Sequence, residues 1–156
     1  MTMSDRMVVM RDGRVAQTGR PDEIYTRPNS VFVATFVGSP KMNILRGNIT
    51  DGTFLGTSGC RIAVAQATVY DEVILGVRPD DLLLTASATG TARVALVELL
   101  GPRAIAHLDA GDDRLTSVVE ADRLSELTVG TTVDLAVRPS ALHLFDPQTE
   151  ERLPEA

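Results

Sequence analysis

The chain has 156 residues, of which 44% are hydrophobic and 23% charged, as is typical of a soluble globular domain. Fifteen basic and 21 acidic residues give a net charge of −6, and there are only six aromatic residues and no tryptophan, so we expect no nucleic-acid partner. The single lysine, Lys41, lies between Pro40 and Met42, which excludes a phosphate-binding P-loop.

The first residues predict a β-hairpin. Met7 to Met10 form a short apolar run, and Asp12-Gly13 is a dipeptide favoured where both central turn residues have positive φ. Arg14 to Thr18 then follow as the returning strand.

Two short helices should come next. Pro21 is suited to a first helical position, and Pro28 should end that helix. Asn29 is a candidate cap for the second helix, on which Phe32 and Phe36 lie four residues apart and share a face.

From Ile44 onward the apolar pattern has a period of two, interrupted by turn sequences, which indicates a β-barrel or a β-sandwich. Asp122 to Leu127 should form one helical turn, and we expect the acidic tail after Asp146-Pro147 to be frayed. The expected strands are Ile44–Thr50, Arg61–Ala65, Glu72–Arg78, Leu82–Ala86, Ala92–Leu100, Arg103–Asp109, Leu115–Glu120, Thr132–Arg138 and Ala141–Phe145.

A ten-residue pattern occurs twice, at 75–84 and again sixty residues later at 135–144. Each copy is a strand, an Arg-Pro corner and a second apolar strand, and the arginines are Arg78 and Arg138. One interpretation is a repeated structural corner in which the arginine bonds backbone carbonyls. The other is a pair of equivalent arginines that contact a ligand.

No catalytic or metal site is expected. The two histidines, His107 and His143, lie in separate predicted strands without local metal-ligand spacing. The single cysteine, Cys60, excludes an internal disulfide and lies beside Gly59 with no assigned basic partner that would lower its pKa. The polar N-terminal residues and the lack of a stretch near ~20 apolar residues favour a cytosolic setting.

The N-terminal segment resembles the end of the ATPase domain in ATP-binding subunits of carbohydrate-type ABC importers, the class for maltose, trehalose or glycerol 3-phosphate. The resemblance is carried in order by Asp5-Arg6, Met10, Asp12-Gly13-Arg14, Gln17, Gly19, Pro21, Glu23-Ile24-Tyr25, Pro28, Phe32-Val33-Ala34, Phe36-Val37-Gly38-Ser39-Pro40 and Met42-Asn43.

The remainder resembles the regulatory domain of the same subunits, the transport-associated oligonucleotide-binding-like (TOBE) barrel. The supporting residues are Gly76-Val77-Arg78-Pro79-Asp80, Val97-Glu98-Leu99-Leu100-Gly101 and Leu142-His143-Leu144-Phe145-Asp146. The resemblance implies a mainly β fold, with an OB-like (TOBE) antiparallel barrel after the hairpin and helices. It also implies three parts: an ATPase-domain remnant at 1–43, the barrel at 44–148 and an acidic tail at 149–156.

The resemblance also sets expectations about function. The Walker motifs, signature motif and switch histidine would lie before Met1, which then corresponds to an internal methionine of a longer parent that binds ATP and magnesium. The chain itself should be non-catalytic and without cofactors. It should act as a regulatory and dimerisation domain on the cytoplasmic side of the membrane, partnered by a second copy, by the permease subunits of the transporter through the parent, and by a regulatory protein or small effector.

Arg78, Asp80, Arg138 and His143, at the repeated corners, are the candidate dimer or effector contacts. An alternative function is small-molecule or oxyanion sensing, because related barrels bind molybdate. Without an ATPase body to cover them, Met7 to Met10, Phe32 and Phe36 should expose an apolar patch that docks on the barrel or on a second chain.

Overall fold

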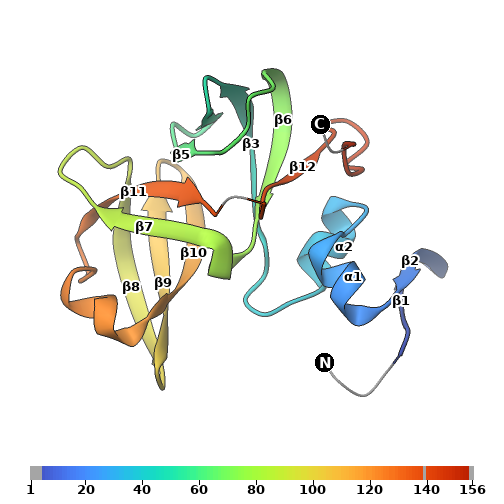
Figure 1. Cartoon of the computed structure of the whole chain (residues 1–156), viewed down its shortest axis with the longest axis horizontal. Helices are drawn as coiled ribbons and strands as arrows, with labels where there is room; N and C mark the ends of the chain where they lie inside the picture. The colour runs from blue at the N-terminus through green and yellow to red at the C-terminus, as the bar shows by residue number, and fades with distance from the viewer. Residues whose placement is uncertain (1–4, 139, 155–156) are drawn as a thin grey trace.

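The computed structural model describes residues 5–138 and 140–154. Figure 1 shows a hairpin and two short helices at the start of the chain and a body of strands after them, so the mainly β prediction is confirmed. The first part contains β1 (Met7–Arg11), β2 (Arg14–Gly19), α1 (Pro21–Thr26) and α2 (Val31–Phe36). The body contains β3 (Asn43–Thr50), β4 (Thr53–Gly56), β5 (Arg61–Ala63), β6 (Tyr70–Val77), η1 (Pro79–Asp81), β7 (Leu82–Ala86), β8 (Ala92–Leu100), β9 (Arg103–Ala110), β10 (Asp113–Glu120), η2 (Ala121–Ser125), β11 (Thr132–Val137) and β12 (His143–Phe145).

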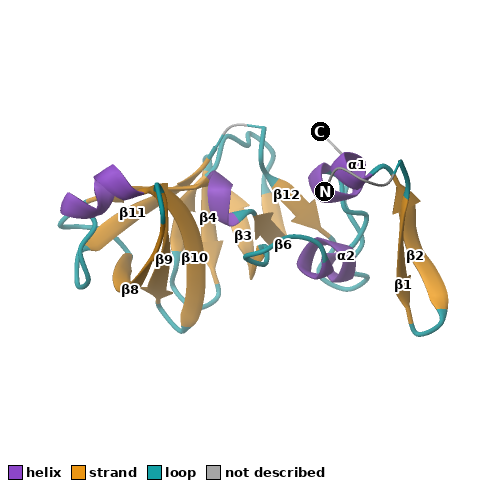
Figure 2. Cartoon of the chain, turned by 90° about the horizontal axis from the view of Figure 1, so that it is seen from below, coloured by secondary structure: helices purple, strands orange, loops and turns teal. Residues whose placement is uncertain are grey.

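The hairpin of β1 and β2 turns where the sequence predicts. Asp12 and Gly13 have φ angles of 51° and 75°, the left-handed values that a two-residue turn of this kind requires. Figure 2 places this hairpin at one end of the molecule and the β8–β10 region at the opposite end.

The two helices form as expected, except at one cap. Asn29 does not cap α2; its side-chain amide donates to the carbonyl oxygen of Ala16 at 2.8 Å. The cap is Ser30, whose hydroxyl oxygen accepts from the Val33 N–H at 3.3 Å. Both residue types suit a helix N-cap, so the neighbouring strand, which offers Asn29 an acceptor, decides between them.

All nine predicted strands are present, with ends that differ by at most two residues. One further strand, β4, was not predicted; it has four residues and lies between the Asp51-Gly52 turn and the turn at 57–59. Four residues carry too short an alternation to be recognised, and β4 owes its place to pairing with β3 and β5 on its two sides.

Ten strands of the described residues form one sheet in the order β10-β9-β8-β11-β5-β4-β3-β6-β12, and β7 pairs with β11 off this path. Two details correct the expectation of an antiparallel barrel. The pairing of β5 with β11 is parallel, and the sheet does not close by backbone pairing between its first and last strands.

Side-chain hydrogen bonds link β10, the first strand of this order, to β3 and β7, which are not its neighbours. The Asn43 amide nitrogen donates to the Thr116 carbonyl oxygen on β10, and the Thr116 N–H donates to the Asn43 amide oxygen, both at 2.8 Å. The Ser117 hydroxyl donates to the Leu82 carbonyl oxygen at 2.7 Å, which ties β10 to β7. Asn43 and Ser117 are both buried, so these bonds add shielded links between strands that share no ladder.

The buried residues form three clusters. The largest fills the barrel and includes Phe54 and Leu75, and a small one under the hairpin includes Val9 and Ile24. The third contains Ala34, Met42, Ile74 and Phe145. Because these four come from α2, the loop after it, β6 and β12, this cluster joins the N-terminal part to the barrel.

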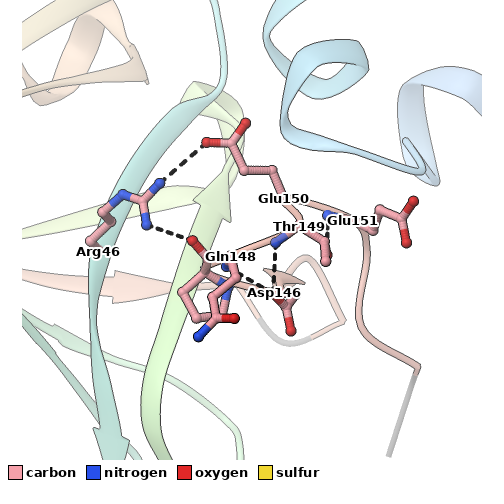
Figure 3. Close-up of polar contacts among 7 residues, drawn as sticks. Arg46, Asp146, Gln148, Thr149, Glu150 and Glu151 are labelled. Carbon is pink, nitrogen blue, oxygen red and sulfur yellow. Dashed lines mark hydrogen bonds and ion pairs between the residues drawn. The ribbon is translucent and has the colours of Figure 1, made fainter.

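The predicted fraying of the C-terminal segment is wrong up to residue 154. Asp146 accepts the N–H groups of Gln148 and Thr149, both at 2.8 Å, and Arg46 donates to the Pro147 carbonyl oxygen and to Glu150 (Figure 3). The tail also pairs with the rest of the chain by lone β-bridges, Ser30 with Glu151 and Phe145 with Arg152. An acidic composition suggests a solvated tail, and these hydrogen bonds and bridges depend on residues far away in the sequence.

The expected apolar patch is present in part. Val9 is buried inside the small cluster, whereas Val8 and Met10 are each 54% exposed and Phe36 is 65% exposed. Alternation along β1 explains the division, because neighbouring strand residues point to opposite faces.

Candidate functional site

The first Arg-Pro corner links β6 to β7 and places Arg78 at the junction with the helices. Its side chain is 2% exposed, and its guanidinium donates to three backbone carbonyl oxygens. Nη1 reaches Ala34 at 3.0 Å and Val37 at 2.6 Å, and Nη2 reaches Tyr25 at 2.8 Å. Arg78 therefore satisfies carbonyl groups at or near the C-terminal ends of α1 and α2, where a helix leaves acceptors unpaired and favours a positive charge.

The surroundings of Arg78 are both apolar and aromatic. Its guanidinium carbon lies 4.1 Å from the centroid of the Tyr25 ring, a cation–π arrangement. Burial lowers the Arg78 pKa and raises the pKa of the Tyr25 hydroxyl. The Nε of Arg78 is the one buried side-chain nitrogen or oxygen of the described residues that has no hydrogen-bond partner.

The second corner lies between β11 and β12, and its arginine has a different environment. The Arg138 side chain is 59% exposed. Its Nε lies 3.4 Å from Oδ1 of Asp81, and its Nη2 donates to the Asp80 carbonyl oxygen at 3.4 Å. The backbone N–H of Arg138 also donates to the Asp81 carbonyl oxygen, so the two corners are bonded to each other. Pro139 of this corner lies outside the described residues.

The two arginines of the repeat are thus not equivalent in structure. Both bond backbone carbonyls, as the structural interpretation of the corner expects, but Arg78 holds the helices and Arg138 holds the other corner. A role for either in dimer or effector contacts stays a prediction.

The two aspartates of the first corner differ in exposure and in partner. Asp80 accepts from Nη1 of Arg103 at 2.9 Å, an exposed pair that contributes little to stability. Asp81 is the more buried of the two; burial raises its pKa and the nearby Arg138 opposes that shift.

His143, on β12, is 6% exposed and contacts the C-terminal segment. Nη1 of Arg152 lies 3.0 Å from its Nδ1. A guanidinium can only donate, so Nδ1 accepts and the ring proton is carried by Nε2. Burial, with the charges of Arg152 and Arg78, lowers the His143 pKa to about 4, and the ring is neutral at pH 7.

Two hollows flank these corners. The larger, of about 550 Å³, lies among α1, the two corners, β12 and the C-terminal segment, and Arg78 and His143 line it. The second, of about 400 Å³, is lined by Asp80, Arg138 and residues of β7 and β10. The structure therefore divides the four predicted site residues into two pairs, and Asp81 lines both hollows.

Three further residues of the larger hollow, Tyr25, Arg27 and Arg152, were not among the predicted site residues. Tyr25 and Arg27 belong to a segment with no motif of its own that points to a ligand. Arg152 belongs to the tail that was expected to fray. Only the fold brings these residues beside the corners.

The described residues contain no cluster of three or more acidic, histidine or cysteine side chains able to hold a metal ion. His107 is paired with Glu98 on the neighbouring strand, with 2.6 Å between Nε2 and Oε2. Cys60 is buried, which raises its pKa to about 11, so its thiol is a poor nucleophile. Within the described part of the chain, no helix is long and apolar enough to cross a membrane.

Two family models match the chain. The MalK OB fold domain matches residues 38–82, and the TOBE domain matches residues 75–145. Both models describe C-terminal domains of the ATP-binding subunits of importers, and neither describes an ATPase domain.

Similar full-length proteins carry importer names. The sn-glycerol-3-phosphate import ATP-binding protein UgpC of Ruegeria pomeroyi is 37% identical over 99% of this chain and 44% of its own length. The xylose/arabinose import ATP-binding protein XacJ of Haloferax volcanii is 34% identical over 96% of this chain and 43% of its own length. The chain thus spans less than half the length of these relatives.

A solved structure supports the fold. The cytoplasmic molybdate-binding protein ModG superposes with a TM-score of 0.52, covering 67% of this chain and 96% of its own, at 19% identity. The OB/TOBE-type fold that the resemblance implies is thereby confirmed, with a sheet that is not closed. The chain belongs, through residues 38–145, to the MalK OB-fold and TOBE domain families found in the C-terminal part of the ATP-binding subunits of sugar ABC importers.

Proposed function

We propose that this chain is a non-catalytic regulatory and dimerisation domain of the ATP-binding subunit of an ABC importer for sugars or related solutes. The observation that carries the proposal is the pair of adjoining domain matches over residues 38–145, in a chain without a phosphate-binding loop. ATP and magnesium would belong to the remainder of the parent subunit.

The proposal includes partners and a location. The relatives are named as import ATP-binding proteins, so the parent of this chain would work with transmembrane permease subunits at the cytoplasmic side of the membrane. A second copy would meet it through the barrels. Regulation then requires that this contact, or an effector bound beside it, differ between two states of the transporter.

One barrel surface suits a contact with a second copy. Leu96, Leu99 and Leu100, at the C-terminal half of β8, are 53%, 67% and 59% exposed. Leu96 and Leu100 lie on the same face of β8 and Leu99 on the other, because neighbouring strand residues alternate between faces. Exposed apolar side chains that share a face, as Leu96 and Leu100 do, mark association sites. We call these three residues the β8 leucines. Asp80 and Arg138 are exposed enough to add polar contacts with a partner, whereas Arg78 and His143 lie in the hollow.

The test is sedimentation equilibrium of the purified chain over a wide concentration range. We expect reversible self-association that Leu100→Lys weakens. Val15→Lys on β2 is the matched control, because Val15 and Leu100 are both 59% exposed and both lie on strands. A strict monomer at high concentration would refute dimerisation, and a larger loss from Val15→Lys would place the contact on the hairpin.

A further inference from the structure

The C-terminal segment, residues 146–154, lies across the junction between the N-terminal helices and the barrel. It follows β12 directly, so its first residue is continuous with the barrel. Arg46 of β3 binds it a second time: Nη1 donates to the Pro147 carbonyl oxygen at 2.9 Å, and Nη2 lies 3.2 Å from Oε1 of Glu150 (Figure 3). The segment is therefore anchored on two strands of the barrel, β3 and β12.

The same segment contacts the N-terminal end of α2. The carbonyl oxygen of Glu150 accepts at 3.0 Å from the N–H of Val31, the first residue of the helix, and the Arg152 N–H donates to the Asn29 carbonyl oxygen at 2.8 Å. The first N–H groups of a helix have no partner within the helix, so an acceptor from outside stabilises this end. The C-terminal end of α2 is held separately, by the guanidinium of Arg78. Different groups thus fix the two ends of one helix to the barrel.

The two attachments differ in burial. Arg78 is buried, and Ala34, one of the residues whose carbonyl oxygen it binds, belongs to the buried cluster that joins α2 to the barrel. The side chains of Arg46 and Glu150 are both about half exposed. Exposed ion pairs contribute little to stability and are screened by salt. The attachment at the N-terminal end of α2 is therefore the more easily broken of the two.

The backbone of the segment is also held at few points. Within the described residues it pairs with the rest of the chain through lone β-bridges and not through a ladder. Glu150 has a φ angle of 61°, a left-handed conformation that is unfavourable for a residue with a Cβ. Its N–H donates to the Asp146 carbonyl oxygen at 2.9 Å, while its carbonyl oxygen and carboxylate bind Val31 and Arg46. Such a strained conformation persists only while its contacts hold it, so breaking them favours release.

We infer that residues 146–154 form a releasable latch, which fixes α2 at both ends when it is closed and leaves α2 attached through Arg78 when it is open. We call this segment the C-terminal latch. An open latch allows α2 to rotate about its C-terminal end. The hairpin and α1 then move with α2, because Val9 and Ile24 pack with Val33 of α2 in the small cluster.

Such a latch would couple the N-terminal part of the chain to the barrel in the proposed regulatory role, and to that extent the inference rests on the proposed function. Regulation requires two states that differ in their contacts, and the closed and open latch differ in this way. Opening itself depends only on this chain. A latch that never opens would leave the dimer proposal standing, and the latch of a monomeric chain could still open.

The test is amide hydrogen exchange of the full 156-residue chain, followed by NMR. The amides of Val31 and Arg152, which bond across the junction, report on the latch. The Val37 amide, bonded to the Val33 carbonyl oxygen, reports on the C-terminal end of α2. The amide of Ala106, a buried residue of β9, reports on global unfolding. We expect the two latch amides to be less protected than the other two.

Arg46→Ala should open the latch. It removes the ion pair with Glu150 and a bond to a backbone carbonyl oxygen, and we expect exchange at the two latch amides to become about tenfold faster while the other two amides are unchanged. Arg103→Ala is the matched control, because the pair of Arg103 with Asp80 is similarly exposed and lies outside the latch. Glu150→Gln removes the same ion pair from the other side and decides the matter if Arg46→Ala does not fold.

The salt dependence of exchange is a second readout. High salt should speed exchange at the latch amides of the unmodified chain, with a smaller effect in Arg46→Ala, because the pair that salt screens is already absent there. The inference is overturned by three results: exchange of all four amides at one common protection, equal acceleration in Arg103→Ala and Arg46→Ala, or a Val37 amide accelerated as much as the latch amides. The last result would show that α2 leaves the barrel at both ends together.

Discussion

Arg78 and Tyr25, 53 residues apart in the chain, are joined twice: the Arg78 guanidinium carbon lies 4.1 Å from the Tyr25 ring centroid, and its Nη2 donates to the Tyr25 carbonyl oxygen at 2.8 Å. One residue belongs to the corner after β6 and the other to α1. This contact, with the bonds from Nη1 to α2 and Val37, attaches the N-terminal part of the chain to the barrel.

Replacing Arg78 by Ala should therefore destabilise the protein. The change leaves three carbonyl oxygens without a donor, and we expect a loss of about 3 kcal/mol in the free energy of unfolding, measured in urea. Arg138→Ala, at the equivalent position of the repeat, should cost less than about 1 kcal/mol because its pairs are exposed. Equal losses for the two arginines would contradict the structural distinction between the corners.

Asn43 should matter in a different way, because its side chain joins β3 to β10, two strands that are not neighbours in the sheet. Asn43→Ala removes both bonds to Thr116 and the bond to the Val77 carbonyl oxygen, and we expect a loss of about 2 kcal/mol. Hydrogen exchange at the Thr116 amide should become faster. Asn48→Ala, on the same strand, is the control, and an unchanged Thr116 exchange rate in Asn43→Ala would speak against this link.

Gly111 and Gly101 offer a matched pair in which the backbone conformation is constant. Both have a φ angle of 64°, but a Cβ at Gly111 would lie 2.1 Å from the Ser58 carbonyl oxygen, whereas a Cβ at Gly101 meets no atom within 4 Å. Gly101→Ala should cost only the left-handed strain of about 1 kcal/mol. Gly111→Ala should cost at least about 3 kcal/mol, since it also separates the β4–β5 and β9–β10 turns. Similar melting temperatures for the two variants would refute the close approach.

The lowered pKa of His143 predicts that the protein becomes less stable in acid. Its pKa is about 4 in the folded protein against 6.5 for the free side chain, so between these values the unfolded chain binds the proton and the folded chain does not. As far as His143 determines it, the free energy of unfolding is therefore highest above pH 6.5. It falls as the pH drops from 6.5 towards 4 and is constant below pH 4. The shift corresponds to roughly 3 kcal/mol.

His143→Gln removes the titrating group and should flatten the stability curve between pH 6.5 and 4. Urea midpoints at a series of pH values measure the difference from the unmodified chain. Parallel curves for the two proteins would show that His143 is not responsible for the acid sensitivity.

The sequence predicts most of the barrel because each long strand has a period-two pattern and ends at a turn. Asp12-Gly13 and Leu82–Ala86 are found where they were expected. The elements and contacts that the sequence does not predict depend on partners that are distant in the chain. The four residues of β4 are ordered by their two neighbours, and the Asn43 side chain pairs with Thr116, 73 residues away.

The candidate site was predictable only in part, for the same reason. The Arg-Pro repeat identifies Arg78 and Arg138, but two similar sequences receive different surroundings, since only Arg78 lies against the helices. Arg152 carries no sequence signal, because its position beside His143 follows from the β-bridge between Phe145 and Arg152.

Distances between spin labels in the assembled chain would show whether two copies meet through their barrels. In a Cys60→Ala background, a label at Leu96→Cys lies beside the proposed contact, and a label at Asp12→Cys lies at the tip of the hairpin. We predict a short, well-defined distance between the two copies for the label at position 96 and a longer one for position 12. A shorter distance for position 12, or the absence of any distance between copies at high concentration, would contradict the account.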